Sequence, residues 1–233
     1  WQGLPKIRNR IVNKQEHSIT VQGCYPDSAH HMEGFNPMIY SDFAFNYTIH
    51  VKAVDNQIIV TVDLDKPVPD KYVGKIGFNL ELFPGYLFGK PWIMDNQTGI
   101  FPRQPLGPTI KQTSNTKYPG NYNPNGKADM KMLTEGTYNP MVADNIIGAP
   151  MAQGTFFVLN PQDSLYRVTR RSEKGDMKLY DGRINHANGW FVLRSDFAEG
   201  VTKEAIKWII TPQVSPQWMY TPVVQTSQIG YHP

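Results

Sequence analysis

Four carboxylates are candidates for catalysing a hydrolysis reaction. Cleavage of a glycosidic bond needs one carboxyl group as the acid and a second as base or nucleophile, about 5–10 Å apart. The candidates are Glu81, Asp95, Asp176 and Asp181. Glu81 alternates with large apolar residues, which predicts the polar face of a strand, and Asp181-Gly182-Arg183 is typical of a turn with a local Asp–Arg contact. No two carboxylates form a convincing pair, so we predict no catalytic residue.

Metal sites have equally weak support. His30 and His31 lie close to Asp27 and Glu33 in the sequence, but adjacent side chains of an extended segment point in opposite directions and rarely bind one ion. Residues 95–99 offer oxygen ligands to calcium, but they lack the length and spacing of a calcium loop. We therefore expect no metal ion and no cofactor.

Aromatic residues form a candidate carbohydrate platform. Sugars expose C–H faces that stack on aromatic rings, and their hydroxyl groups pair with planar amides and arginine. The candidates lie in surroundings rich in proline and glycine, and they are Trp92, Phe101, Arg103, Tyr86 and Tyr118, with Tyr122 and Tyr138 in similar surroundings. The alternative is that these rings cap the core of a β protein, because aromatic side chains bury large areas. Trp190 and Trp208 lie within predicted strands, which favours core packing.

The composition excludes several functional classes. The 233 residues carry 23 Lys+Arg and 20 Asp+Glu, and this small basic excess argues against nucleic-acid binding. With 19 Gly, 19 Pro and only 18% charged residues, the chain does not resemble a coiled coil, a helical bundle or a disordered tail. The single cysteine, Cys24, excludes an intrachain disulfide. The sequence contains no run of about 18 apolar residues, so we expect no transmembrane segment.

The same composition suits an extracytoplasmic β protein. We therefore expect an exported protein, whether periplasmic, cell-surface or secreted. The sequence begins at Trp1 without a leader peptide, so the export signal is not present in it.

The dominant periodicity is that of β-strands. Residues 43–51 alternate between large and small or polar side chains, and the turn pair Asp55-Asn56 precedes a second run at 58–64, which predicts a β-hairpin over residues 43–64. The large side chains on one face are Phe43, Phe45, Tyr47, Ile49 and Val51. Further strands are expected at 76–82, 155–159, 165–170, 189–194 and 205–210.

Many short strands with turn-rich joints predict an all-β fold, a β-sandwich with jelly-roll or immunoglobulin-like layers. Residues 102–150 are rich in Pro, Gly and Asn and predict a long loop region, either a surface excursion or a functional rim. One helical turn is expected at 202–205, and residues 217–225 look extended. We predict one domain at 1–221 followed by a linker or strand at 222–233, with two smaller sheets divided near 102–150 as the alternative.

The residues of the C-terminal end carry a family resemblance. Residues 222–233, PVVQTSQIGYHP, resemble the opening strand of the immunoglobulin-like domain of glycoside hydrolase family 9 enzymes, which precedes their catalytic helical barrel. Residues 77–83 with 99–103, and residues 181–195, resemble the region upstream of that domain in such enzymes from Bacteroidetes. The resemblance covers roughly residues 17–233 and implies an N-terminal non-catalytic module of a cellulase-like enzyme.

The resemblance brings no catalytic residue with it. The family's aspartate pair belongs to a D-A-G-D type motif and its acid glutamate lies near the far C-terminus, and neither is present here. The resemblance implies that the parent enzyme degrades a polysaccharide of the β-glucan or cellulose class and carries immunoglobulin-like and catalytic domains after this module. Three functions remain open: an accessory module that packs against its next domain, a carbohydrate-binding module that uses loop aromatics, and an independent hydrolase.

Overall fold

The computed structural model describes residues 5–27, 43–105, 107–111, 146–183, 189–217 and 219. These residues form fifteen β-strands and two 3-10 helices, η1 (Asp70–Tyr72) and η2 (Pro84–Tyr86), and no α-helix. No helix in the described ranges is long and apolar enough to cross a membrane. The all-β prediction is therefore confirmed.

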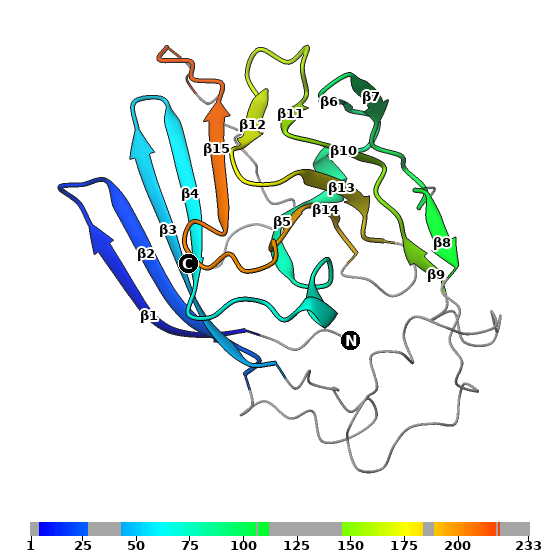
Figure 1. The fold of residues 1–233 in the computed structure, drawn as a ribbon. Helices are drawn as coiled ribbons and strands as arrows, with labels where there is room; N and C mark the ends of the chain where they lie inside the picture. The colour runs from blue at the N-terminus through cyan, green and yellow to red at the C-terminus, as the bar shows by residue number, and fades with distance from the viewer. Residues whose placement is uncertain are drawn as a thin grey trace, which may run out of the picture.

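The strands form two main antiparallel sheets (Figure 1). The large sheet has the order β1 (Lys6–Asn13), β2 (Ser18–Tyr25), β3 (Phe45–Val54), β4 (Gln57–Leu64), β15 (Ile206–Pro212), β12 (Val168–Ser172), β11 (Phe156–Leu159), β6 (Pro91–Met94) and β7 (Gln97–Ile100). The small sheet has the order β10 (Ala152–Gly154), β13 (Met177–Asp181), β14 (Phe191–Asp196) and β5 (Gly77–Leu82). A separate pair joins β8 (Thr109–Lys111) to β9 (Ile146–Gly148).

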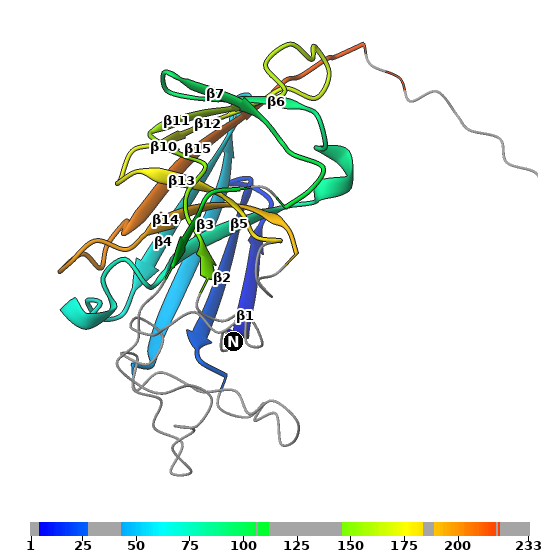
Figure 2. The ribbon, with the colours of Figure 1, turned by 90° about the vertical axis from the view of Figure 1, so that its right-hand side faces the viewer.

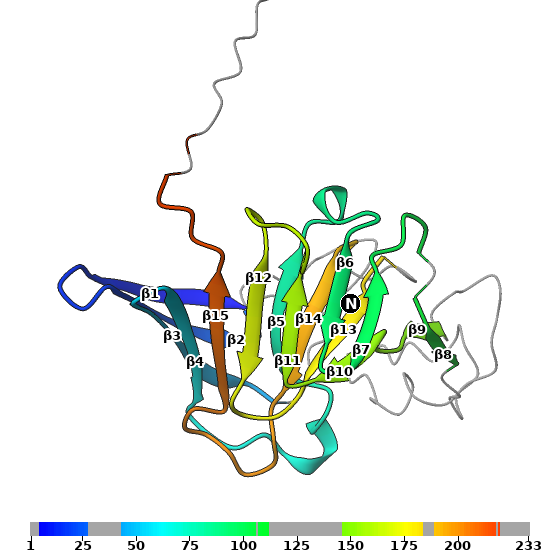
Figure 3. The ribbon, with the colours of Figure 1, turned by 90° about the horizontal axis from the view of Figure 1, so that it is seen from above.

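The core lies between the two sheets, which makes the fold a β-sandwich. Seen from above, the small sheet lies alongside β12, β11 and β6, whereas β1, β2 and β3 extend to one side (Figure 3). The large sheet supplies Trp208 and Phe157 to the core, and the small sheet supplies Phe191 and Leu193. Phe78 of β5 contacts Trp208 edge-on with 5.1 Å between ring centroids, and this contact joins the layers.

The predicted hairpin is present as β3 and β4. Asp55 adopts a positive φ of 51° in the turn between them, a conformation that Asp and Asn tolerate better than most residues. Figure 2 shows the large sheet from the side, with β3, β4 and β15 running alongside one another. The alternating large side chains of residues 43–51 are buried or packed against the core, as their period predicts.

The first three strands form a part of the large sheet that we call the arm, residues 6–25 and 45–54. The strand pairing places Val12, Ile19, Val51 and Val60 in one row, on the face that continues into the sandwich core. The neighbouring row, Ile11, Thr20, His50 and Thr61, lies on the opposite and mainly polar face. Antiparallel strands with this alternation usually have one face covered and one in water.

Local side-chain hydrogen bonds shift two of the predicted elements. The strand expected at 165–170 begins at Val168, because Asp163 accepts the N–H groups of Leu165 and Tyr166 and holds a turn there. The helical turn expected at 202–205 is a turn without helix, in which Glu204 has a φ of 44° and donates its N–H to Asp63. Three predictions fall mostly or wholly outside the described residues. They are the long loop at 102–150, the extended segment at 217–225 and the domain boundary at 221.

Candidate functional site

Three aromatic rings meet at one end of the small sheet. The last pair of the β5–β14 ladder is Leu82 with Phe191, so the residues just beyond it, Phe83 and Trp190, lie opposite one another. Their ring centroids are 5.2 Å apart and their planes meet at 60°. The register of two strands therefore fixes this contact.

The third ring comes from η2, which follows Phe83 directly. Both Leu87 and Phe88 donate their backbone N–H to the carbonyl of Pro84, so the turn is closed by two hydrogen bonds. It carries Tyr86 beside Phe83, with 5.4 Å between centroids and 62° between planes. We call Phe83, Tyr86 and Trp190 the aromatic cluster. Tyr86 is 81% exposed and Phe83 51% exposed, whereas Trp190 is half-buried.

Arg183 holds the structure behind the cluster. Its guanidinium forms two hydrogen bonds with the buried carboxylate of Asp181, at 2.7 and 2.8 Å. The same guanidinium donates to three consecutive backbone carbonyls, those of residues 102–104, at 2.8–3.0 Å. It also lies over the rings of Phe88 and Phe191, which are neighbours in sequence of η2 and Trp190. Arg183 thus joins residues 102–104 to the two chain segments that carry the cluster.

Two of the predicted carbohydrate-binding residues belong to the core. Trp92 is only 6% exposed, and its ring covers Gly99, where an added Cβ would overlap the indole. Phe101 is fully buried and packs against Phe191 with 4.6 Å between centroids. Neither ring has a face open to a sugar, which corrects their assignment to a surface platform. The alternative weighed for them, core packing, describes both.

The other predicted residues have different environments. Tyr86 is exposed and belongs to the cluster, and Arg103 is exposed, with its backbone carbonyl bound by Arg183. Tyr118 lies outside the described residues, as do Tyr122 and Tyr138. Trp208 is a core residue, as predicted, and its Nε1 donates to Ser195 Oγ at 3.0 Å.

Sequence reasoning missed two members of the cluster. Trp190 was expected in the core, but it lies just before β14 and is only half-buried, because the sheet ends there. Phe83 was not singled out. The available signal was its position between a strand and the turn residues Pro84-Gly85, which carries it beyond the covered part of β5.

The four candidate carboxylates lie at separate structural positions. Asp95 accepts the N–H groups of Thr155 and Phe156, where the chain passes from β10 to β11. Asp176 accepts a hydrogen bond from Gln153, and Asp181 is paired with Arg183 as the turn pattern predicted. Glu81 is exposed on the outer face of β5, as its alternation predicted. The two oxygens of Asp95 that were considered for calcium thus bind the backbone.

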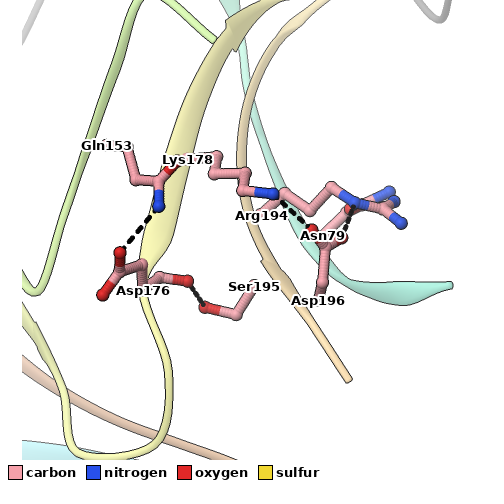
Figure 4. A network of polar contacts seen from close by, with 7 residues as sticks. All are labelled: Asn79, Gln153, Asp176, Lys178, Arg194, Ser195 and Asp196. Carbon is pink, nitrogen blue, oxygen red and sulfur yellow. Dashed lines mark hydrogen bonds and ion pairs between the residues drawn. The ribbon is translucent and has the colours of Figure 1, made fainter. Parts of the chain in front are cut away.

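A polar network covers part of the outer face of the small sheet (Figure 4). The strand register places Gln153, Lys178, Arg194 and Asn79 in one row across the four strands. Asp196 accepts hydrogen bonds from Lys178 at 2.7 Å and from Arg194 at 2.6 Å, and Arg194 also donates to Asn79. The hydrogen bond and charge of Asp196 raise the pKa of Lys178 despite its partial burial. These side chains satisfy one another and stabilise the sheet.

Two shallow grooves occur on the described surface. One, of about 400 Å³, is lined by Lys6, Arg8, Asp27 and Asp65 among others, and the Asp65 carboxylate binds the backbone and side-chain amides of Asn46. The other, of about 450 Å³, crosses the outer face of the large sheet and has no carboxylate in its lining. Among the described residues no three His, Cys, Asp or Glu side chains gather as metal ligands, and His30 and His31 lie outside those residues.

Comparison with known proteins assigns no family. No protein-family model matches the chain, and no curated protein sequence matches it. The resemblance to glycoside hydrolase family 9 therefore stays a prediction.

Proposed function

We propose that this chain is a non-catalytic accessory module of an exported, polysaccharide-degrading glycoside hydrolase of the β-glucan class. Its role is to support the enzyme by packing against the domain that follows it in the polypeptide. Residues 222–233 resemble the opening strand of an immunoglobulin-like domain, so we infer that the following domain is of that type. The observation that carries the proposal is the mainly apolar inner face of the arm.

This face continues the core surface beyond the small sheet. The strand register places the exposed Ile7 and Val12 of β1 and the half-buried Ile19 and Val21 of β2 on the inner side. The exposed Arg10, which pairs with Val21, lies on the same side. Figures 1 and 3 show β1 and β2 outside the part of the large sheet that faces the small sheet. Each square ångström of apolar surface removed from water contributes about 25 cal/mol of stabilisation. A domain that covers this face would therefore stabilise the folded protein.

The partners of the carboxylates also favour a non-catalytic role. A glycoside hydrolase needs two carboxyl groups that face one substrate across a groove. Here Asp95, Asp176 and Asp181 each bind a neighbouring group of the scaffold, and Glu81 lies on the outer face of β5. An independent hydrolase is the function that these contacts favour least.

Differential scanning calorimetry tests the packing role. The transition of this module should shift to higher temperature when the module is joined to its following domain, because docking stabilises only the folded state. Val12→Asp should reduce that shift. The matched control is Ile11→Asp, one residue away on the outer face of the same strand, which should leave the shift intact. A transition at the same temperature in both proteins would refute the proposal.

Carbohydrate binding is a second candidate function, and the exposed aromatic cluster is the specific observation that favours it.

A further inference from the structure

We propose that the aromatic cluster of Phe83, Tyr86 and Trp190 binds a single chain of a neutral β-linked glucan. This inference rests on the second candidate function named above, carbohydrate binding, and names its ligand; it uses a different surface from the packing role. The cluster lies at the end of β5 and β14, whereas the packing role rests on the arm.

The cluster is rigid enough to act as a binding surface. The ladder of β5 and β14 fixes Phe83 and Trp190, and two backbone hydrogen bonds close the turn that carries Tyr86. Arg183 joins residues 102–104 to the rings of Phe88 and Phe191, which lie in the two segments that carry the cluster. Rings that are already in place lose little conformational freedom on binding, which favours affinity.

The exposed area suits a small or extended ligand. An aromatic side chain presents roughly 150–250 Å². With Tyr86 exposed to 81%, Phe83 to 51% and Trp190 half-buried, the cluster offers roughly 300–400 Å². A stable protein interface needs about 800 Å² on each partner. Two or three sugar rings, in contrast, would fill a surface of this size.

The chemistry of the surface selects a neutral pyranose. Equatorial hydroxyl groups leave the two faces of a β-linked glucose ring lined with C–H groups, which pack against aromatic rings. Glu81 is exposed two residues before Phe83, so the extended backbone places its carboxylate on the same face as the Phe83 ring. Its negative charge disfavours an acidic sugar beside the cluster.

The tilt of the rings selects a single chain over a crystal face. Phe83 makes angles of 62° with Tyr86 and 60° with Trp190, so the three rings do not share a plane. A flat cellulose surface can lie against several rings only when they are coplanar. A free glucan chain turns about its glycosidic bonds and can present successive sugar rings at different angles.

The test is affinity electrophoresis of the whole chain in gels that contain hydroxyethyl cellulose, xyloglucan or mixed-linkage β-glucan, with titration calorimetry on cellohexaose. We expect retardation by at least one soluble glucan. Tyr86→Ala and Phe83→Ala should each weaken binding roughly ten- to hundredfold, a range taken from the stacking of bases on aromatic rings. The matched control is Tyr166→Ala, another exposed tyrosine (62%), which lies between β11 and β12 and should bind as the parent does.

Each other outcome overturns the proposal. Absence of retardation in all three gels would mean that the cluster does not bind glucan. Binding that survives both Tyr86→Ala and Phe83→Ala would place the ligand elsewhere. Stronger pull-down on microcrystalline cellulose than on soluble chains would contradict the single-chain assignment. Because Tyr86 is so exposed, its variant should keep the parent's melting temperature. These measurements are independent of the calorimetric shift that tests domain packing.

Discussion

Among single residues, Arg183 has the most demanding set of contacts. It pairs with a carboxylate whose side chain is fully buried, and it donates to the three carbonyls of residues 102–104. The turn pattern Asp181-Gly182-Arg183 predicts the local pair, but it does not predict the long-range carbonyl contacts. Those depend on residues about 80 positions earlier in the chain, which only the tertiary structure brings close.

Removal of Arg183 should therefore be costly. Arg183→Met leaves Asp181 buried without its cation, and we expect a loss of about 3–5 kcal/mol in the free energy of unfolding, measured with urea. Asp181→Asn combined with Arg183→Met should be less harmful than Arg183→Met alone, because no buried charge is then left unpaired. Arg171→Met is the control: its exposed pair with Glu173 should contribute at most about 1 kcal/mol. Equal losses at both arginines would contradict this account.

Residue types alone predict the aromatic platform poorly. Of the five residues proposed from the sequence, Tyr86 and Arg103 are exposed, Trp92 and Phe101 are core, and Tyr118 lies outside the described residues. Tryptophan and phenylalanine near Pro and Gly are equally compatible with a loop surface and with a buried strand end. The choice depends on which side of the sheet faces the second layer, and that information is not local.

At the scale of elements, local sequence patterns predict where strands lie better than they predict which strands pair with each other. Alternation and the turn pair Asp55-Asn56 predict the β3–β4 hairpin, because both signals lie within residues 43–64. The pairing of β4 with β15 and of β5 with β14 joins segments more than 100 residues apart. Sheet order, and with it the meeting of Phe83 and Trp190, could not be predicted from the sequence.

Asp63 illustrates how a loop is tied to a strand. This β4 carboxylate accepts the N–H of Glu204 at 2.7 Å and the ammonium of Lys203 at 3.2 Å, just before β15 begins. Burial by itself raises the pKa of Asp63, but these hydrogen bonds and the charges of Lys203 and His50 outweigh it and hold the pKa below its ordinary value. The ionised form therefore stabilises the fold.

The contribution of Asp63 should depend on pH. With its pKa lowered in the folded state, its stabilisation is complete above the unfolded-state pKa of about 4 and is lost as the pH falls through the lower folded value. Urea unfolding of the parent and of Asp63→Asn should differ at pH 7, and the difference should shrink as the pH falls below the unfolded-state pKa of Asp63. A difference that stays constant over this range would show that the charge of Asp63 is not responsible.

For the whole molecule, the two-layer part and the arm should differ in local stability. Phe191 and Leu193 of β14 are fully buried between the sheets, whereas nearly all of β1 is exposed. Strands with few buried contacts open more readily than the core. Hydrogen–deuterium exchange should be slowest in β14 and fastest in β1. Uniform protection of both strands would contradict the division of the molecule into a sandwich and an arm.

The edge strand β1 has features that disfavour pairing with another copy of this chain. Among the described strands β1 ends the large sheet, with Lys6, Arg8 and Arg10 along it, and a bulge between Ile7 and Asn9 interrupts its regular spacing. Another molecule that added a strand here would bring like charges together on an uneven ladder, which is how natural sheets resist edge-to-edge aggregation. We therefore expect the large sheet to resist extension into a fibril at this edge.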